Sequence, residues 1–151
     1  MMSTDILIRG IEPGDAAAAA RLCGELGYPL EAAEARERID ILTGSRHSAV
    51  HVACVSGEVV GWIDVALDCS LAAGRYAEIR GLLVSSEHRS HGIGRMLIRH
   101  VEAWAAAQGA ASMLVRSRVS RERAHRFYLR EGYSMVKTSA VFAKQLAQPS
   151  P

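Results

Sequence analysis

The sequence is poor in cysteine and has no clustered metal ligands. Its three cysteines, Cys23, Cys54 and Cys69, form no CxxC pair and leave an odd number. This excludes a disulfide framework and favours reduced thiols in a cytoplasmic protein. The histidines include no HExxH motif, and the HxxxH spacing of His47 and His51 falls on a strand-like stretch. We therefore expect no disulfide and no metal.

The sequence also lacks a charged-then-apolar leader and an apolar run long enough to span a membrane. Secretion and membrane insertion are therefore not expected, which again favours the cytoplasm. The net charge is only +2, which argues against a general nucleic-acid binder. Arginines do gather locally, either as solvated helix faces or as an anion site: Arg89, Arg95, Arg99, Arg116, Arg118, Arg121, Arg123 and Arg126.

What is present fits one globular domain covering residues 1–151. The chain is 49% hydrophobic and 23% charged, and no repeat or linker divides it. Hydrophobic periodicity predicts, in chain order, a strand at 5–13, helices at 14–27 and 30–42, a hairpin at 48–67, a strand at 74–84, a helix at 92–108, a strand at 111–117, a helix at 121–132 and two last strands at 133–139 and 140–146.

The run of three strands in the middle excludes a regular doubly wound fold. We expect an α/β fold of the α+β type, with a mixed, mostly antiparallel, seven-stranded sheet flanked by about four helices. Asp15 is a candidate N-cap for the first helix, and Gly81 indicates a bulge or splay in the strand at 74–84.

A glycine-bearing turn between a strand and a helix, "SSEHRSHGIGRMLIRH" (85–100), is the clearest candidate site. It has no GK[ST] of a Walker A loop, and Leu97 stands where a dinucleotide fingerprint needs its third glycine. What remains is Arg89-x-x-Gly92-x-Gly94. Two glycines let the backbone close on a ligand, and the start of a helix favours an anion. A tight turn that needs glycine for its backbone conformation is the alternative.

Two motifs resemble those of the GNAT N-acetyltransferase superfamily. "LLVSSEHRSHGIGRMLIRHVEAWA" is similar to its acetyl-CoA motif, and "RERAHRFYLREGY" is similar to its next motif, with a strand between them. The resemblance implies the GNAT fold and acetyl-CoA as co-substrate. The cofactor-binding residues that it implies are Leu82, Leu83, Val84, Arg89, Ser90, His91, Gly92, Ile93, Gly94, Arg95, Arg118, Ala124, Phe127 and Tyr128.

Three positions depart from the superfamily pattern. Ser86 stands where many members have proline, and Ser90 where they have glycine. Arg118 replaces an asparagine that close relatives place against the cofactor, so this contact stays open.

Acetyl transfer needs a neutral amine, donors for the oxyanion and a proton for the thiolate. A tyrosine hydroxyl aimed at the sulfur can supply that proton, and the resemblance places Tyr128 there. It places the oxyanion donor near Leu83 or Val84. Glu78 is the candidate base, acting through water, although an ion pair with Arg80 is an equal alternative. Asp64 and Asp68 are rivals as base or as ligands of the substrate ammonium.

The acceptor is expected to be a primary amine of a small molecule, for example an aminoglycoside-like one, attacked directly in a ternary complex. Alternatives are a protein or peptide amine, or a non-catalytic acyl-CoA-binding regulatory domain. The last strands are apolar and form one end of the predicted sheet, where an open edge invites pairing. A homodimer is therefore possible. Neither nucleic acid nor membrane is expected as a partner.

Overall fold

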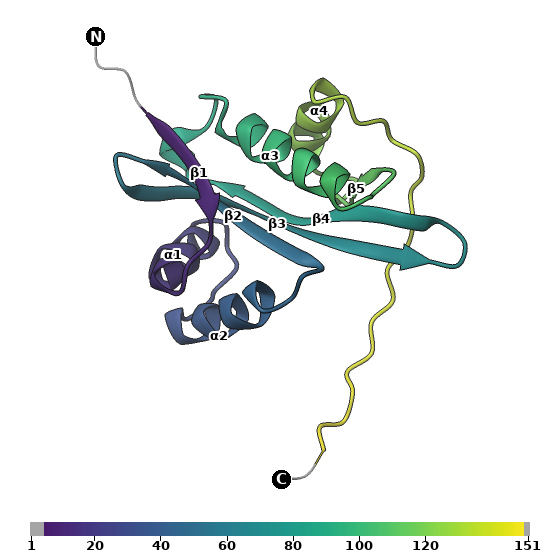
Figure 1. The fold of residues 1–151 in the computed structure, drawn as a ribbon, viewed down its shortest axis with the longest axis horizontal. Coiled ribbons are helices and arrows are strands. Elements are labelled where there is room, and N and C mark those ends of the chain that lie inside the picture. Colours follow the sequence, from purple (N-terminus) through teal and green to yellow (C-terminus); the bar gives the residue numbers. More distant parts are fainter. Residues whose placement is uncertain (1–4, 150–151) are drawn as a thin grey trace. The chain divides into compact units, whose positions relative to one another are not determined.

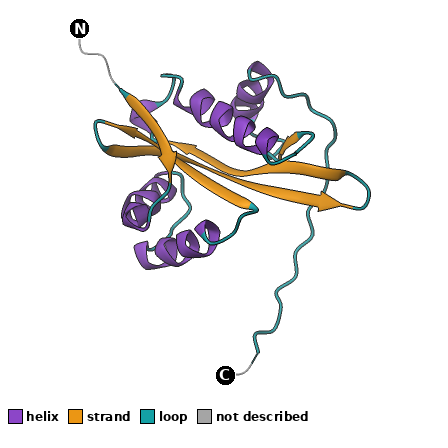
Figure 2. Cartoon of the chain, in the orientation of Figure 1, coloured by secondary structure: helices purple, strands orange, loops and turns teal. Residues whose placement is uncertain are grey.

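The computed structural model describes residues 5–149. Figure 2 shows strands and helices in the order that the sequence predicts up to the fourth helix. The elements are β1 (Ile6–Gly10), a short 3-10 turn (Pro13–Asp15), α1 (Ala16–Glu25), α2 (Ala32–Thr43), β2 (Ser48–Val55), β3 (Glu58–Ser70), β4 (Gly74–Val84), a second 3-10 turn (Ser86–His88), α3 (Ile93–Ala107), β5 (Met113–Val115) and α4 (Glu122–Arg130).

The mixed, mostly antiparallel sheet is confirmed, but it has fewer strands than expected. Within residues 5–149 the sheet has five strands in the order β1-β2-β3-β4-β5. β1 to β4 are antiparallel neighbours, and β5 joins β4 in parallel. The prediction of seven strands was wrong, because residues 133–149 form neither strand nor helix. The predicted strand at 111–117 also shortens to three residues.

The β2–β3 hairpin closes by a two-residue turn. Ser56 and Gly57 both have positive φ, 52° and 81°. Two left-handed central residues give the turn whose twist matches the right-handed twist of the strands. Val55 therefore lies directly opposite Glu58. The register then shifts, because Cys54 pairs with Val59 whereas Ala53 pairs with Gly61.

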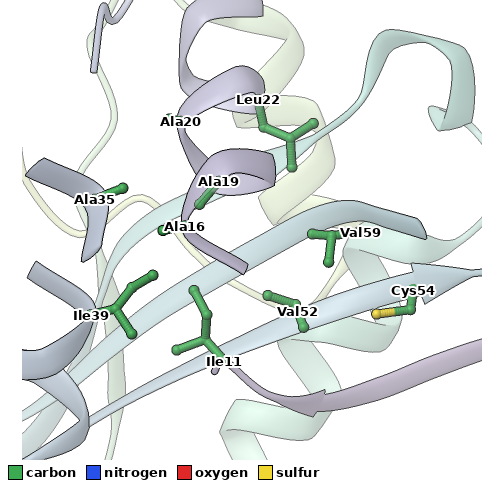
Figure 3. Close-up of a cluster of buried hydrophobic side chains, with 10 residues drawn as sticks. All are labelled: Ile11, Ala16, Ala19, Ala20, Leu22, Ala35, Ile39, Val52, Cys54 and Val59. Atoms are coloured by element: carbon green, nitrogen blue, oxygen red, sulfur yellow. The ribbon is translucent and has the colours of Figure 1, made fainter. Parts of the chain in front are cut away.

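One face of the sheet packs against α1 and α2 (Figure 1). Figure 3 shows its core, where Leu22 of α1 and Ile39 of α2 lie over Val52 and Val59 of the sheet. The small residues of the alanine run let α1 approach closely: Ala16, Ala19 and Ala20 are all buried.

The opposite face packs against α3 (Figure 1). The apolar stripe of this helix is buried as the periodicity predicts: Ile93, Leu97, Ile98, Val101 and Ala105. His51 of β2 and His100 of α3 contact each other here, with ring centroids 4.4 Å apart. Burial, followed by the neighbouring His100, lowers the pKa of His51. Ile63 pairs with His51 across β2 and β3, so it lies on this face.

Asp15 precedes α1, as predicted, but it does not cap the helix with its side chain. Its carboxylate accepts two hydrogen bonds from Arg9, at 2.8 and 2.9 Å, and one from the Glu12 amide at 2.8 Å. The bonds from Arg9 are the main cause that lowers the pKa of this buried carboxyl. Because this pair joins β1 to the start of α1, it fixes how the helix enters the sheet face.

The chain forms two compact units, one ending at Arg116 and one beginning at Ser117. The first holds the sheet with α1, α2 and α3, and the second holds α4 and the C-terminal segment. The single domain over residues 1–151 stays a prediction. Among the described residues, no helix has the length and apolarity needed to cross a membrane.

Replacing glycine by alanine at two positions should have opposite effects on stability, because the surroundings of the two glycines differ. A Cβ on Gly61 in β3 would lie 2.8 Å from the backbone oxygen of Leu83, whereas one on Gly24 in α1 would meet no atom within 4 Å. Gly61→Ala should lower the free energy of unfolding by about 1–3 kcal/mol through overpacking. Gly24→Ala should raise it by up to about 1 kcal/mol through helix propensity. Urea denaturation of both variants checks the pair, and equal effects would contradict the strand contact at Gly61.

Candidate active site

The end of β4 separates from its neighbour β5. The two strands pair only between Ala77–Ile79 and Met113–Val115. Beyond Ile79, β4 continues to pair with β3 as far as Val84, so within the described residues its other edge is left without a ladder partner. A backbone edge of this kind offers amides and carbonyls to an extended ligand. The unpaired edge includes Leu82, Leu83 and Val84, and a splay of the two strands stays a prediction.

A bulge marks the place where the strands separate. Asp64 lies opposite Gly81, but Val65 lies opposite Ile79, which leaves Arg80 as the extra residue. A bulge bends its strand and interrupts the ladder. This confirms the prediction made from Gly81. Glycine is also required there by packing, because a Cβ would lie 2.8 Å from Cζ3 and 2.9 Å from Cη2 of the Trp62 ring.

The loop after β4 is held at its base by three hydrogen bonds to backbone carbonyls. The Ser85 amide donates to the Val60 carbonyl at 2.7 Å, and the His88 amide donates to the Ser85 carbonyl at 2.9 Å. Arg89 Nε donates to the Val84 carbonyl at 3.3 Å. Arg89 therefore ties the loop to the end of β4. Nδ1 of His88 is buried and has no hydrogen-bond partner in the part of the chain that the structure describes.

The loop turns into α3 through left-handed backbone. Ser90 has φ of 67° and Gly92 has φ of 80°. Gly92 is the N-cap of α3, and no side chain caps the helix. The amides of a first helical turn have no intrahelical acceptor, and the helix dipole favours an anion there. A Cβ on Gly92 would meet no atom within 4 Å, so the requirement for glycine is conformational and the space beside it is open.

Three carboxylates line the face of the sheet on which Trp62 lies. Asp64 and Trp62 are two residues apart on β3, so they share a face. Asp64 Oδ1 accepts from Arg80 Nη2 at 2.9 Å and from Arg80 Nε at 3.3 Å. Arg80 Nη2 also donates to the Ser48 hydroxyl at 3.3 Å. The partner of Arg80 is therefore Asp64, and the alternative of a Glu78–Arg80 pair was wrong.

Glu78 shares this face, because it lies opposite Ala66, two residues from Asp64. Its Oε2 lies 3.6 Å from Nε of Arg116, within ion-pair distance. Asp68 accepts a hydrogen bond from the Tyr76 hydroxyl at 3.0 Å, which is the main cause that raises the pKa of Tyr76. Asp64 and Asp68 are thus hydrogen-bonded, whereas Glu78 is held by a longer charge contact.

In the second unit, the residues of the second sequence motif end α4 and pack their aromatic rings against one another. Gly132 has φ of 94°, which lets the Tyr133 amide donate to the Tyr128 carbonyl at 3.0 Å. This closure places the Tyr133 ring edge-on to the Tyr128 ring, with centroids 5.9 Å apart. The Phe127 ring also lies edge-on to the Tyr128 ring, with centroids 5.3 Å apart. Ala124 and Phe127 are both half-buried.

Tyr128 remains a proton donor at neutral pH. Burial raises the pKa of its hydroxyl, and the nearby Arg121 lowers it by less. In the same unit, Nε2 of His125 lies 2.8 Å from the Arg118 carbonyl, and the Arg121 amide donates to that carbonyl at 3.0 Å. The carbonyl of Arg118 is thus held by these contacts, whereas Arg118 as a whole is exposed.

Three residues of this face were not predicted from the sequence as site residues: Trp62, Ser48 and Tyr76. Each reaches the face of the carboxylates from a neighbouring position on the sheet, so only the register brings it there. The signal for Trp62 was its alternation with Asp64. A groove of about 520 Å³, lined by residues of β1 and α3, was not predicted either and contains none of the motif glycines: Ile8, Arg95, Met96, Arg99, His100 and Ala103. Among the described residues, no group of three or more metal-ligating side chains gathers.

The edge of β4 that is unpaired beyond Ile79 leads into the start of α3, which no side chain caps. The family comparison gives the class of the protein. The acetyltransferase (GNAT) family matches residues 18–133, and the chain belongs to that family. It is therefore an acetyltransferase of the GNAT family, as the two sequence motifs predicted.

Two relatives and one solved structure are similar to this chain over different shares of its length. An aminoglycoside N(6')-acetyltransferase type 1 of Stenotrophomonas maltophilia is 29% identical over 155 aligned residues, covering 99% of each chain. An aminoalkylphosphonate N-acetyltransferase of Salmonella typhimurium is 38% identical over 79 residues, covering 52% of this chain and 51% of its own. A solved aminoglycoside N-acetyltransferase, AAC(6')-Iy in complex with CoA, shares the fold with a TM-score of 0.85 at 15% identity, over 96% of this chain and 98% of its own.

The start of α3 can be tested by adding a charge to it. Gly92→Asp should abolish the thermal stabilisation that coenzyme A confers, because a carboxylate at the N-cap repels an anion. Gly92→Asn is the matched control, since asparagine has a similar shape, tolerates left-handed backbone and carries no charge. It should weaken the stabilisation without removing it. Thermal shift with and without coenzyme A checks both variants. If Gly92→Asp retained the full shift, the anion would lie elsewhere.

Proposed function

We propose that this protein transfers the acetyl group of acetyl-CoA to a primary amine of a small, cationic molecule of the aminoglycoside kind. The observation that carries the proposal is the unpaired edge of β4 beside the uncapped start of α3. The full-length similarity to an aminoglycoside N(6')-acetyltransferase supports the acceptor class.

The residues present fit coenzyme A. A pantetheine arm carries amides that can pair with the open edge at Leu82, Leu83 and Val84. A pyrophosphate suits the loop Arg89 to Arg95, where Gly92 leaves open space and the helix dipole favours negative charge. The buried Nδ1 of His88 is a polar group that a ligand or water can satisfy. When bound, acetyl-CoA supplies the activated acyl group and a thiolate leaving group.

The chain's own residues have three tasks in the reaction. Glu78 accepts a proton from the acceptor ammonium through water, so that a neutral amine can attack. A backbone amide near Leu83 or Val84 donates to the oxyanion that develops on the carbonyl oxygen. The hydroxyl of Tyr128 gives its proton to the departing sulfur. Arg116 lies 3.6 Å from Glu78 and positions its side chain.

The charge of the carboxylate face favours a cationic acceptor. Three carboxylates, Asp64, Asp68 and Glu78, stand against two guanidinium groups, Arg80 and Arg116. The excess of negative charge favours an amine with several positive charges over a phosphonate, which carries negative charge itself. The charge of this face therefore favours an acceptor of the aminoglycoside kind over one of the aminoalkylphosphonate kind.

The direct experiment measures thiol release from acetyl-CoA with a panel of amines. The panel contains an aminoglycoside, a linear polyamine, an aminoalkylphosphonate and a lysine-containing peptide. We expect release with the aminoglycoside and little with the phosphonate. Release with the peptide alone would move the acceptor to proteins. Binding of coenzyme A without release for any amine would indicate an acyl-CoA-binding regulatory domain.

Tyr128→Phe should lower kcat by about 10²-fold or more, in the range of general acid catalysis. The ring and its packing on Tyr133 stay, and only the proton is lost. Affinity for acetyl-CoA should barely change, because the interaction is made in the transition state. Since burial raises the pKa of the hydroxyl, the wild-type rate should not fall from ionisation of Tyr128 below about pH 10.

Steady-state kinetics of Tyr128→Phe beside Tyr133→Phe checks this assignment. Tyr133 packs on Tyr128 and is the matched control, so its variant should keep most of kcat. A Tyr128→Phe enzyme with near-normal kcat would mean that the thiolate leaves without assistance.

A further inference from the structure

The side chain of Arg80 lies across the face of the sheet that carries the carboxylates. It starts on β4, reaches Asp64 on the neighbouring strand β3 and ends at Ser48 on β2, the next strand of the sheet. Nη2 donates to Oδ1 of Asp64 at 2.9 Å and to the Ser48 hydroxyl at 3.3 Å. The guanidinium group therefore covers the part of this face that surrounds Asp64.

The bulge in β4 explains why Arg80 takes this course. As the extra residue of the strand, Arg80 has no partner of its own in the ladder to β3. The residue that follows it, Gly81, lies directly opposite Asp64. Because glycine has no side chain, the carboxylate is open to the guanidinium of the residue before it. The charge of Asp64 is consequently compensated by a residue of the fold itself.

The contact between Arg80 and Asp64 is accessible to solutes. The side chain of Arg80 keeps 40% of its surface exposed, and that of Asp64 keeps 21%. Nε and Nη2 of Arg80 donate to the same oxygen of Asp64, at 3.3 and 2.9 Å, so both hydrogen bonds depend on Oδ1. An ion pair that is open to water contributes little stability. A second cation can therefore replace the guanidinium at little cost.

Asp64 is placed to bind a group of the acceptor that does not react. Glu78, the proposed base, lies opposite Ala66, two positions along β3 from Asp64. Two positions along a strand are about 7 Å apart and share one face. An acceptor with two ammonium groups at this spacing can place one near Glu78 and the other at Asp64. Asp68 lies further from the open end of β4, because it pairs with Tyr76 near the β3–β4 turn.

We propose that Asp64 is a subsite for a second ammonium group of the acceptor, and that Arg80 competes with this group for the carboxylate. Arg80 is then a specificity-determining residue, because its competition decides how much an acceptor gains from a second positive charge. A monoamine uses only the region near Glu78, so its binding depends little on Arg80. The inference rests on the proposed function, since it concerns the acceptor of that reaction.

Equilibrium binding tests the subsite independently of turnover. Isothermal titration calorimetry without acetyl-CoA measures the affinity for three amines of increasing charge: glucosamine, putrescine and neamine. Arg80→Gln should tighten the binding of putrescine and neamine by about two- to fivefold, the range of one exposed ion pair, and leave that of glucosamine almost unchanged. The gain should shrink at high salt, because salt screens charges that are open to water. Unchanged affinity for putrescine and neamine would overturn the proposal.

Three variants separate the subsite from a general effect of charge. Arg99→Gln removes one positive charge from an exposed ion pair on α3, 3.2 Å from Glu102 and on the other face of the sheet, and should leave the affinities unchanged. Arg80→Lys keeps the charge and should keep the wild-type affinities. Asp64→Asn combined with Arg80→Gln should bind putrescine no more tightly than the wild type, because the freed carboxylate is gone. A double variant as tight as Arg80→Gln alone would place the gain elsewhere and overturn the subsite.

Thiol release from acetyl-CoA with the same amines separates this inference from the proposed reaction. Tighter binding to Arg80→Gln without thiol release from any amine would support the subsite and contradict the reaction. Thiol release with the same KM for putrescine in the wild type and Arg80→Gln would leave the reaction intact and overturn the subsite. A lower KM for putrescine in Arg80→Gln supports both. If none of the three amines bound to either protein, the subsite would be overturned as well.

Discussion

The bulge in β4 is the feature on which the candidate site depends. With Arg80 as an extra residue, the ladder to β5 ends at Ile79 while the ladder to β3 continues to Val84. The strand is thus anchored on one edge and open on the other. The same extra residue aims Arg80 at Asp64, 2.9 Å away, on the face where Glu78 also lies. The irregularity in backbone pairing therefore lies beside the open edge of β4 and arranges the charges of the carboxylate face.

The chemistry follows from how these charges are compensated. Asp64 is bound by Arg80 and Asp68 by the Tyr76 hydroxyl, so neither is available without breaking a hydrogen bond. Among the described residues, the charge contact of Glu78 is the longer one to Arg116, at 3.6 Å. The second unit keeps Tyr128 protonated by burying it beside Phe127 and Tyr133. Acetyl transfer to an amine needs a base and an acid, and we propose Glu78 and Tyr128 for these two tasks.

Much of this could be predicted from the sequence, because the signals are local. The strand at Gly74–Val84 was predicted at its observed bounds, and Gly81 indicated the bulge. The glycine turn needs left-handed backbone at Gly92, and the motif around Tyr128 needs it at Gly132. The partner of Arg80 was not predictable, because strand alternation places Glu78 nearby and only the register selects Asp64. The prediction of the last two strands was wrong for a related reason. The β propensity of a segment shows that it can pair, but it does not show with which edge.

The central claim is that the open edge of β4 and the start of α3 bind coenzyme A together. Amide hydrogen exchange, measured with and without coenzyme A, tests it most directly. The account predicts slower exchange on binding in two separate stretches, 82–84 and 92–95, with β1 and β2 unchanged. Slowing in the loop alone would contradict the role of the open strand edge. No slowing in either stretch, at a concentration that stabilises the protein against heat, would contradict the site itself.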